Sequence, residues 1–529
     1  MTRSWWDGAV IYEIYPRSFA DSDGNGVGDL RGIIEHLDHL AGRDDSLGVD
    51  AIWLAPFYAS PWADGGYDVA DHCAVHPTLG TLSDFDELVA ACHRRGLQVL
   101  VDLVPNHTSD RHPWFEEARR SRGSARRDWY VWRDPRADGS PPNDWQSAFA
   151  GVGPVWTFDP GTDQYYLHSY LSQQPDLDWW NPAVRRAFDR IIGFWLDRGV
   201  DGFRIDVAHK MARDPALRDH EAEVAAGGRR RDEDWPEVHE ILRDFRRSLD
   251  ARGNRLALGE VGLVDIDRVV PYFGRDDELH LAFDFEFMHA RWDAETFRRA
   301  IERAEALTPS FTVPTYVLGS HDVPRIASRF DGDGRGIERS RLLAVLLLTL
   351  RGTIVLYQGD ELGSRDVPVI ANESNDRAGR DPQRAPMVWQ AEPDRAFTHG
   401  TPWLPLPATE RGLGAVEQRR DPSSILSLVT RLLALRRRAS ALQGGPLEGL
   451  MVDGDVLTFR RHGHGDSFLV AVNFGLQEAT VQLGDATAEV VVSSRRDRPM
   501  ATLVRGSTLS LGPLEAIVTR GLDVRAPTV

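Results

Sequence analysis

The chain has 529 residues, a formal net charge of −18 at pH 7, and a hydrophobic fraction of 42% with 16 Trp. A single core stops growing near roughly 250–300 residues, so this length predicts a large domain with smaller units attached to it. The acidic balance argues against nucleic acid or an anionic membrane as the main partner and favours a neutral small molecule.

The cysteine content and the N-terminal sequence bear on where the protein works. Cys73 and Cys92 are the only cysteines, which excludes a disulfide framework, and neither stands in a metal-binding spacing. The segment MTRSWWDGAVIYEIYP lacks the apolar core of a signal peptide, and no run of about 18 apolar residues occurs. We therefore expect a cytoplasmic protein without a membrane segment.

Eight short apolar segments recur along the chain and read as strands. In order they lie within residues 9–16, 46–56, 93–106, 196–208, 250–261, 281–287, 314–322 and 350–362. Several begin after a glycine that follows a basic residue, such as Gly96 and Gly199, as at a helix end that leads into a strand. Amphipathic stretches with helical spacing follow most of them. This alternation predicts an α/β fold, a parallel (β/α)8 TIM barrel, with an open doubly wound sheet as the structural alternative.

Two inserts and a C-terminal change of pattern divide the chain. We predict the first part of the barrel at 1–104, an inserted subdomain at 105–176, and the second part of the barrel at 177–443 with an insert at about 364–422. From 444 to 529, short alternating segments such as SFLVAVNF predict an antiparallel β domain, a β-sandwich.

The stretch VDGFRIDVAHKM, residues 200–211, carries charges inside an apolar segment. In a strand, Arg204 and Asp206 point to one side, while Phe203 and Ile205 point to the other. A buried structural ion pair would explain this stretch taken alone. Other strands of the predicted barrel, however, also end in polar residues: Asp102, Asn106, His107, Glu260, His321 and Asp322.

The C-terminal ends of barrel strands are where such enzymes carry their chemistry. Paired carboxylates at one mouth indicate glycosyl transfer, in which one carboxylate attacks or stabilises the sugar carbon and the other protonates the leaving oxygen. We expect Arg204 to keep Asp206 ionised, and apolar neighbours to keep Glu260 protonated.

These residues also carry a family resemblance. DLVPNHTS, DGFRIDVAH, LALGEV and GSHD, in this order, resemble the four signature regions of glycoside hydrolase family 13, the α-amylase superfamily. WWDGAVIYEIYPRSFADSDGNGVGDLRGI and YYLHSYLSQQPDLDWWNP look more narrowly like its oligo-1,6-glucosidase and α-glucosidase branch.

The resemblance implies roles for individual residues. Asp206 matches the nucleophile, Glu260 the general acid/base, and Asp322 the acid that grips substrate hydroxyls and assists the transition state. Matching substrate-binding residues are Asp64, Tyr67, His107, Phe149, Gln174, Arg204, His321 and Arg380, with Asp102 in support. For Tyr67 and Phe149, ordinary aromatic packing is the alternative.

Some positions depart from the family pattern, and one bears on linkage. Ser320 stands where Asn is common, Gly262 where Trp is common, and Gln390 where Asp is common, which puts the leaving-group preference in doubt. In the resembling branch, Val at position 207 goes with acceptance of α-1,6 bonds; a plain core valine is the alternative.

The segment DSDGNGVGD, residues 21–29, resembles the divalent-cation loop of the family. Its alternating oxygen groups suit a hard cation; they are the side chains of Asp21, Asp23, Asn25 and Asp29 and the carbonyl of Val27. We expect structural Ca²⁺ or Mg²⁺ there and no organic cofactor, with a metal-free Asp/Gly turn as the alternative.

The resemblance implies a retaining, exo-acting α-glucosidase that works through a covalent glucosyl-enzyme. Its expected substrates are short malto- or isomalto-oligosaccharides, sucrose or aryl glucosides. A transglucosylase or glucoside isomerase would use the same residues, so it remains the alternative. A non-catalytic scaffold or transporter partner fits less well, because all three acids are present. Monomer and homo-oligomer stay open.

Overall fold

A computed structural model of the chain describes residues 4–220, 230–369, 376–391, 397–483, 487–499, 502–504 and 508–521. The predicted insert at 364–422 and the predicted domain at 444–529 both include residues outside these ranges. Among the described helices, none has the length and apolarity needed to cross a bilayer.

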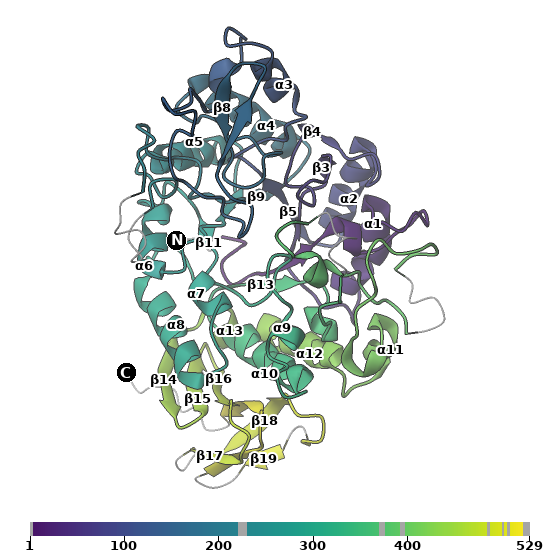
Figure 1. The fold of residues 1–529 in the computed structure, drawn as a ribbon. Helices are drawn as coiled ribbons and strands as arrows, with labels where there is room; N and C mark the ends of the chain where they lie inside the picture. Colours follow the sequence, from purple (N-terminus) through teal and green to yellow (C-terminus); the bar gives the residue numbers. More distant parts are fainter. Residues whose placement is uncertain are drawn as a thin grey trace.

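A parallel eight-stranded barrel forms the centre of the molecule (Figure 1), and each strand lies within a segment that the sequence predicts. Its strands are β1 (Val10–Ile14), β2 (Ala51–Leu54), β5 (Gln98–Leu103), β9 (Gly202–Ile205), β10 (Leu256–Gly259), β11 (Leu281–Ala282), β12 (Thr315–Val317) and β13 (Thr353–Tyr357). Between β11 and β12 the Asp284 N–H donates to the Thr315 carbonyl at 3.0 Å, which links the two edges. The predicted TIM barrel is therefore confirmed.

One main helix follows each barrel strand. These helices are α1 (Leu30–Leu40), α2 (Leu82–Arg94), α4 (Pro182–Asp197), α5 (Val238–Asp250), α6 (Ile266–Val269), α8 (Ala294–Leu307), α10 (Gly336–Thr349) and α12 (Ile425–Arg438). Local sequence sets their ends: Thr81 and Asp84 form a capping box at the start of α2. Gly96 and Gly199, with φ of 76° and 92°, turn the chain from α2 into β5 and from α4 into β9.

Inside the barrel, apolar side chains lie below a polar layer. Ile11, Leu100 and Leu258 belong to the apolar interior cluster. Towards the C-terminal ends of the strands, the ladder sets Asp102 of β5 directly beside Arg204 of β9. Because alternate strand residues share a direction, the polar layer points into the barrel above the apolar one.

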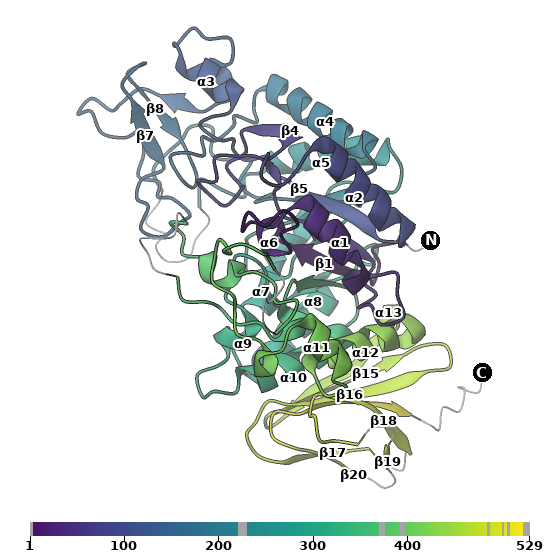
Figure 2. The ribbon, with the colours of Figure 1, turned by 90° about the vertical axis from the view of Figure 1, so that its right-hand side faces the viewer.

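The chain between β5 and α4 forms a separate small sheet at one end of the molecule (Figure 2). It contains β6 (Trp132–Arg133), β7 (Trp156–Asp159) and β8 (Gln164–Leu167), with α3 (Pro113–Arg119) before it. A short pair, β3 (Tyr58–Ala59) and β4 (Asp71–Val75), lies in the connection after β2. Within the described ranges, the barrel region also contains the short helices α7 (Phe285–Met288), α9 (Ile326–Arg329), α11 (Ala415–Arg420), η1 (Pro16–Ser18), η2 (Arg127–Trp129), η4 (Val270–Phe273), η5 (Asp360–Leu362), η6 (Asp381–Arg384) and η7 (Glu410–Gly412).

An antiparallel β domain follows α13 (Ser440–Gly444) and lies at the opposite end from β7 and β8 (Figures 1 and 2). Its main sheet has the order β14 (Leu447–Asp453), β15 (Val456–His462), β16 (Ser467–Asn473), β21 (Ala516–Gly521), β18 (Ala488–Ser493) and β19 (Thr502–Val504). A second sheet pairs β17 (Ala479–Gln482) with β20 (Thr508–Leu511), and an apolar cluster joins Leu469 of the first sheet to Leu509 of the second.

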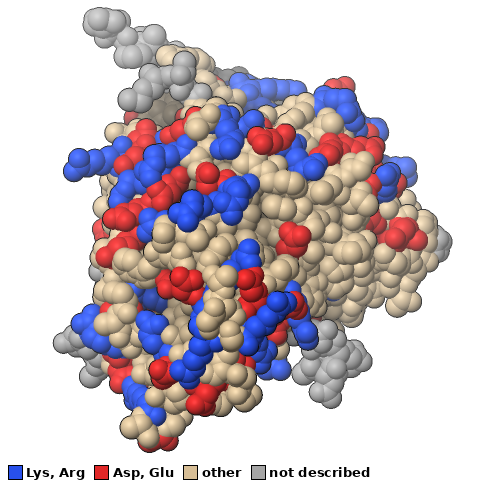
Figure 3. Space-filling view, turned by 90° about the horizontal axis from the view of Figure 1, so that it is seen from above, with Lys and Arg blue, Asp and Glu red and all other residues tan. Residues whose placement is uncertain are grey.

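Positive and negative side chains are mixed on the face of the molecule shown in Figure 3. Blue Lys and Arg side chains and red Asp and Glu side chains are interspersed there, although the chain carries a net charge of −18. Such a face offers no concentrated field for a charged polymer.

Candidate active site

Three acids from three strand ends line one cavity of about 370 Å³. Asp206 follows β9 directly, Glu260 follows β10 directly, and Asp322 lies in the loop after β12. Asp64, Tyr67, His107, Phe149 and Arg380 also line the cavity. Eight of the eleven residues predicted as catalytic or substrate-binding therefore face one space, and Gln174, Arg204 and His321 lie behind its wall, at most 2% exposed.

Arg204 joins three carboxylates beneath the cavity. Its Nη1 donates to Asp102 Oδ1 and to Asp206 Oδ1, each at 2.6 Å. Its Nη2 lies 2.7 Å from Glu260 Oε2. The contact predicted between Arg204 and Asp206 is present, but the same guanidinium also contacts Asp102 and Glu260.

This sharing changes the expected electrostatics of Asp206. Burial raises the pKa of Asp206 well above its usual range, and Arg204 opposes that effect. Burial likewise raises the pKa of Asp102 to about 6 against the same guanidinium. The expectation that Arg204 keeps Asp206 ionised is therefore corrected: burial, together with Glu260 and Asp102, outweighs Arg204 and raises the pKa of Asp206.

Glu260 is tied to the residue that follows Asp206. The Glu260 N–H donates to the Ile205 carbonyl at 2.9 Å, and its Oε2 accepts the Val207 N–H, also at 2.9 Å. Val207 adopts a φ of 38°, which is rare for a β-branched residue. Backbone contacts, as well as Arg204, therefore fix the position of Glu260 relative to Asp206.

Asp322 is surrounded by cations. Its Oδ1 accepts from Arg380 Nη1 at 3.2 Å and from Arg384 Nη2 at 3.1 Å, and its Oδ2 lies 3.2 Å from His321 Nε2. Burial by itself would raise the pKa of Asp322, but His321 and the two guanidinium groups outweigh it and hold the pKa well below the usual range. Asp322 is therefore an anion at neutral pH.

A network of polar contacts forms part of the cavity wall. Asp64 pairs with Arg380 through Oδ1 and accepts from Gln174 Nε2 at 2.8 Å through Oδ2. Gln174 Nε2 also lies 3.0 Å from His107 Nε2. The Arg380 guanidinium stacks 4.6 Å above the Phe149 ring. Asp64 and His107 are at most 3% exposed, so these contacts are buried in the cavity wall.

Several residues of the site were not predicted from the sequence. Tyr170 lines the cavity, with its ring 5.0 Å from Phe149 and 5.4 Å from His107. Arg384 lies four residues beyond Arg380 in the same segment. Glu13 lies in β1 and contacts His321. Glu13 could have been found from the sequence, because it is a single charged residue inside an apolar strand, as Arg204 is.

Two departures from the family pattern have local explanations. A Cβ at Gly262 would lie 2.8 Å from His209 Cε1, and the Gly262 N–H donates to His209 Nδ1 at 3.1 Å. A large side chain at position 262 therefore requires His209 to move. Ser320 Oγ accepts the Asp322 N–H at 3.2 Å and so holds the start of the acid's loop.

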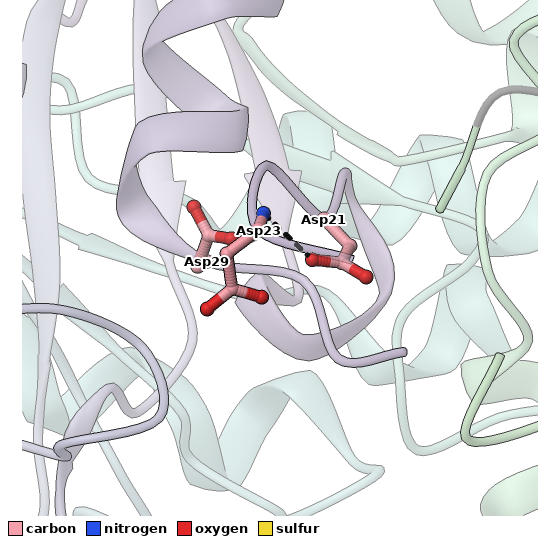
Figure 4. Close-up of side chains that lie close together, drawn as sticks. All are labelled: Asp21, Asp23 and Asp29. Carbon is pink, nitrogen blue, oxygen red and sulfur yellow. Dashed lines mark hydrogen bonds between the residues drawn. The ribbon is translucent and has the colours of Figure 1, made fainter. Parts of the chain in front are cut away.

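The predicted cation loop lies between β1 and α1. Asp21, Asp23 and Asp29 bring carboxylate oxygens within 4.8 Å of one another (Figure 4). Asn25 Nδ2 donates to Asp23 at 3.0 Å, and the Val27 N–H donates to Asn25 Oδ1 at 2.8 Å. Three hard oxygen donors at this spacing fit Ca²⁺ or Mg²⁺ chemically.

Comparison with known proteins places the chain in a family. Residues 13–445 match the alpha-amylase catalytic domain. A probable alpha-glucosidase of Rhizobium meliloti (strain 1021) is 40% identical over 513 residues, covering 91% of each chain. An oligo-1,6-glucosidase of Parageobacillus thermoglucosidasius is 34% identical, covering 93% of this chain and 95% of the relative. The crystal structure of an alpha-glucosyl transfer enzyme superposes with a TM-score of 0.91 at 38% identity, covering 98% of this chain and 100% of the other. The chain therefore belongs to the alpha-amylase family and is a glycoside hydrolase.

Proposed function

We propose that this enzyme is a retaining, exo-acting α-glucosidase that releases glucose from the non-reducing end of short α-glucosides. The observation that carries the proposal is the cavity itself: three acids line it, and the paired Asp64 and Arg380 form part of its wall. In this proposal the pair closes the pocket behind the terminal sugar, so that the pocket accepts the end of a sugar chain rather than its middle. The glucosidases among the relatives support the same substrate class.

In this proposal, Asp206 attacks the anomeric carbon and Glu260 protonates the departing oxygen. Water, activated by the same Glu260, then hydrolyses the glucosyl-enzyme. Asp322, held as an anion, accepts hydrogen bonds from the sugar hydroxyls. A retaining mechanism requires the carboxyl groups of Asp206 and Glu260 to lie about 5–5.5 Å apart in the loaded enzyme.

The test is a substrate panel with product analysis. Maltose, isomaltose, maltotriose, sucrose and an aryl α-glucoside are each incubated with the enzyme, products are separated by chromatography, and the first anomer released is read by NMR. We expect glucose as the first product, in the α form. Internal cleavage of longer chains would overturn exo action, and β-glucose as the first product would overturn retention.

A second candidate is transfer of the glucosyl unit to a sugar hydroxyl. The alpha-glucosyl transfer enzyme with a TM-score of 0.91 to this chain favours it. Transfer and hydrolysis differ only in the acceptor that reaches the glucosyl-enzyme, so the same panel at high substrate concentration separates them. New oligosaccharides in excess of free glucose would identify a transglucosylase.

Two further expectations belong to this proposal. A structural Ca²⁺ or Mg²⁺ held by the loop of residues 21–29 is supported by its three clustered carboxylates. A cytoplasmic location is supported by the two free thiols of Cys73 and Cys92. Metal analysis of the purified protein and fractionation of the source cells test them separately.

A further inference from the structure

We propose that Glu13 is a positioning residue of this active site, which keeps both ring nitrogens of His321 protonated so that an imidazolium faces Asp322. The inference rests on the proposed glucosidase function, because it concerns the acid that would grip the sugar.

Glu13 occupies an unusual place for a carboxylate. It lies in β1 with 0% exposure, and it shares the inward face of the strand with Ile11 of the interior cluster. Its neighbours Tyr12 and Ile14 belong instead to the cluster between barrel and helices. A buried carboxylate is costly unless a partner compensates its charge, so its partner defines its role.

That partner is His321, which lies between two acids. His321 Nδ1 forms a hydrogen bond of 2.5 Å with Glu13 Oε1, whereas Nε2 lies at ion-pair distance from Asp322, 3.2 Å from Oδ2, without hydrogen-bond geometry. Ionised carboxylates only accept hydrogen bonds, whereas a neutral imidazole has a single N–H. Either neutral tautomer would turn a lone pair towards one of the acids. Only the imidazolium both donates to Glu13 and presents a positive charge to Asp322.

The surroundings fix the His321 ring and favour its charge. The ring is stacked between Tyr15 at 5.8 Å and Tyr67 at 5.3 Å, with interplanar angles of 16° and 10°. Aromatic faces stabilise a cation placed over them. Trp53 of β2 meets the ring edge-on at 6.1 Å, and Arg384 of η6 donates to the His321 carbonyl. Asp102 of β5 is a further acid close enough to interact electrostatically with His321.

Burial and the two acids act on His321 in opposite directions. Burial alone would lower the pKa of His321, but Asp322 and Glu13 outweigh it and raise the pKa to about 9. With Glu13 neutralised, Asp322 alone must hold the second proton. His321 then loses that proton at lower pH, and Asp322 loses one of its three cations.

The experiment compares Glu13→Gln with the wild type by the pH dependence of kcat/KM on one glucoside. We expect near-normal activity in mildly acidic solution, and an alkaline limb displaced towards neutral pH by about one unit or more. The matched control is Glu361→Gln. Glu361 is also buried and also paired with a histidine, His39 at 2.9 Å, but this pair lies outside the barrel between η5 and α1. We expect Glu361→Gln to lower the melting temperature without moving the pH profile.

A second measurement does not depend on the folding of Glu13→Gln. NMR of ¹³C-labelled histidine side chains in the wild-type protein, assigned with His321→Gln, should show His321 titrating near pH 9. A His321 that is already neutral at pH 7 would overturn the proposal, as would a Glu13→Gln variant that loses the same factor of activity at every pH. The titration also reports on a chain that proves inactive on glucosides, so failure of the proposed function is distinguishable.

Discussion

At the scale of single residues, the active site is organised around a shortage of positive charge. Asp102, Asp206 and Glu260 all contact Arg204, within 2.6–2.7 Å. One cation cannot neutralise three anions, so the cluster favours retaining a proton, and its titration belongs to the group rather than to one acid. In the proposed mechanism, attack by Asp206 requires its ionised form, and Glu260 is the acid that serves the leaving group. Glu260 also has the most exposed side chain of the three, at 16%, where a leaving group can reach it.

Asp206→Asn tests the nucleophile. We expect kcat to fall by roughly three or more orders of magnitude, because no other carboxyl occupies the attacking position. The melting temperature should not fall, since the amide keeps the shape and removes a charge whose burial is unfavourable. Asp197→Asn, at the exposed end of α4, is the matched control and should retain full activity. Turnover of Asp206→Asn within about tenfold of wild type would remove Asp206 from the role.

Val207→Thr tests linkage preference. Val207 lines the cavity, and its stiff apolar side chain can bias how the leaving sugar leans without a hydrogen bond. Both residues are β-branched, so the unusual φ of 38° is equally demanding for each, and polarity is the main change. We expect activity on isomaltose and maltose in the wild type, and a shift towards maltose in the variant worth about 1–3 kcal/mol at most. An unchanged isomaltose-to-maltose ratio of kcat/KM would mark Val207 as a packing residue.

At the scale of elements, the parts predicted from sequence are those with local causes. Strand composition, alternation of strand and helix patterns, and glycine turns depend on a few neighbouring residues in the sequence. All eight barrel strands and the turns at Gly96 and Gly199 could therefore be predicted. The pairing of β17 with β20, and the hydrogen bond from Asp284 that joins β11 to β12, depend on contacts between distant segments. A short stretch of sequence does not indicate such contacts.

The site follows the same division. Asp206, Glu260 and Asp322 could be located because each sits at or just beyond a strand end inside a recognisable motif. Glu13 and His321 are 308 residues apart, and nothing local links them. The sharing of Arg204 by three acids also requires the folded barrel, because burial and neighbouring charge together set the pKa of each carboxyl.

The cation loop is an element whose role is open to direct test. Asp29 caps α1 by accepting the Gly32 N–H at 2.7 Å, and Asp21 contacts Thr398 of the second insert, so the loop ties three parts of the chain together. We expect Asp21→Ala to lower the melting temperature and to abolish its response to calcium and to EDTA. A cation bound only to the native state stabilises by about 2.7 kcal/mol at a hundredfold excess over Kd.

The control for the cation loop is Asp44→Ala, an exposed acid in the connection after α1. It should leave both the melting temperature and the calcium response unchanged. A large loss of kcat in Asp21→Ala at an unchanged melting temperature would show that the loop acts on catalysis rather than on stability.

At the scale of the whole molecule, the barrel and the C-terminal β domain share one core. The largest apolar cluster runs from Leu342 of α10 into Phe459 and Val470 of the β domain. The Trp292 and Phe474 rings pack at 4.9 Å across the same boundary. Among the described residues, those that line the cavity fall between 64 and 380, and none of them belongs to the β domain. We therefore expect the β domain to affect activity through the stability of the fold.

Arg461 offers the sharpest test of that coupling. It lies on β15 with 0% exposure, and its guanidinium donates to four carbonyls, those of Thr349, Ala441, Leu442 and Gly445. Arg461→Leu leaves these buried acceptors without their donor, at a cost of about 3 kcal/mol or more. We expect a melting temperature lower by several degrees, a single transition for the whole chain, and an unchanged kcat at 25 °C.

Arg460→Leu is the matched control, because Arg460 is the exposed neighbour on the same strand and should change neither quantity. Two separate transitions in Arg461→Leu would show that the β domain unfolds on its own, and a lower kcat well below the melting temperature would show that it reaches the active site by a route other than stability.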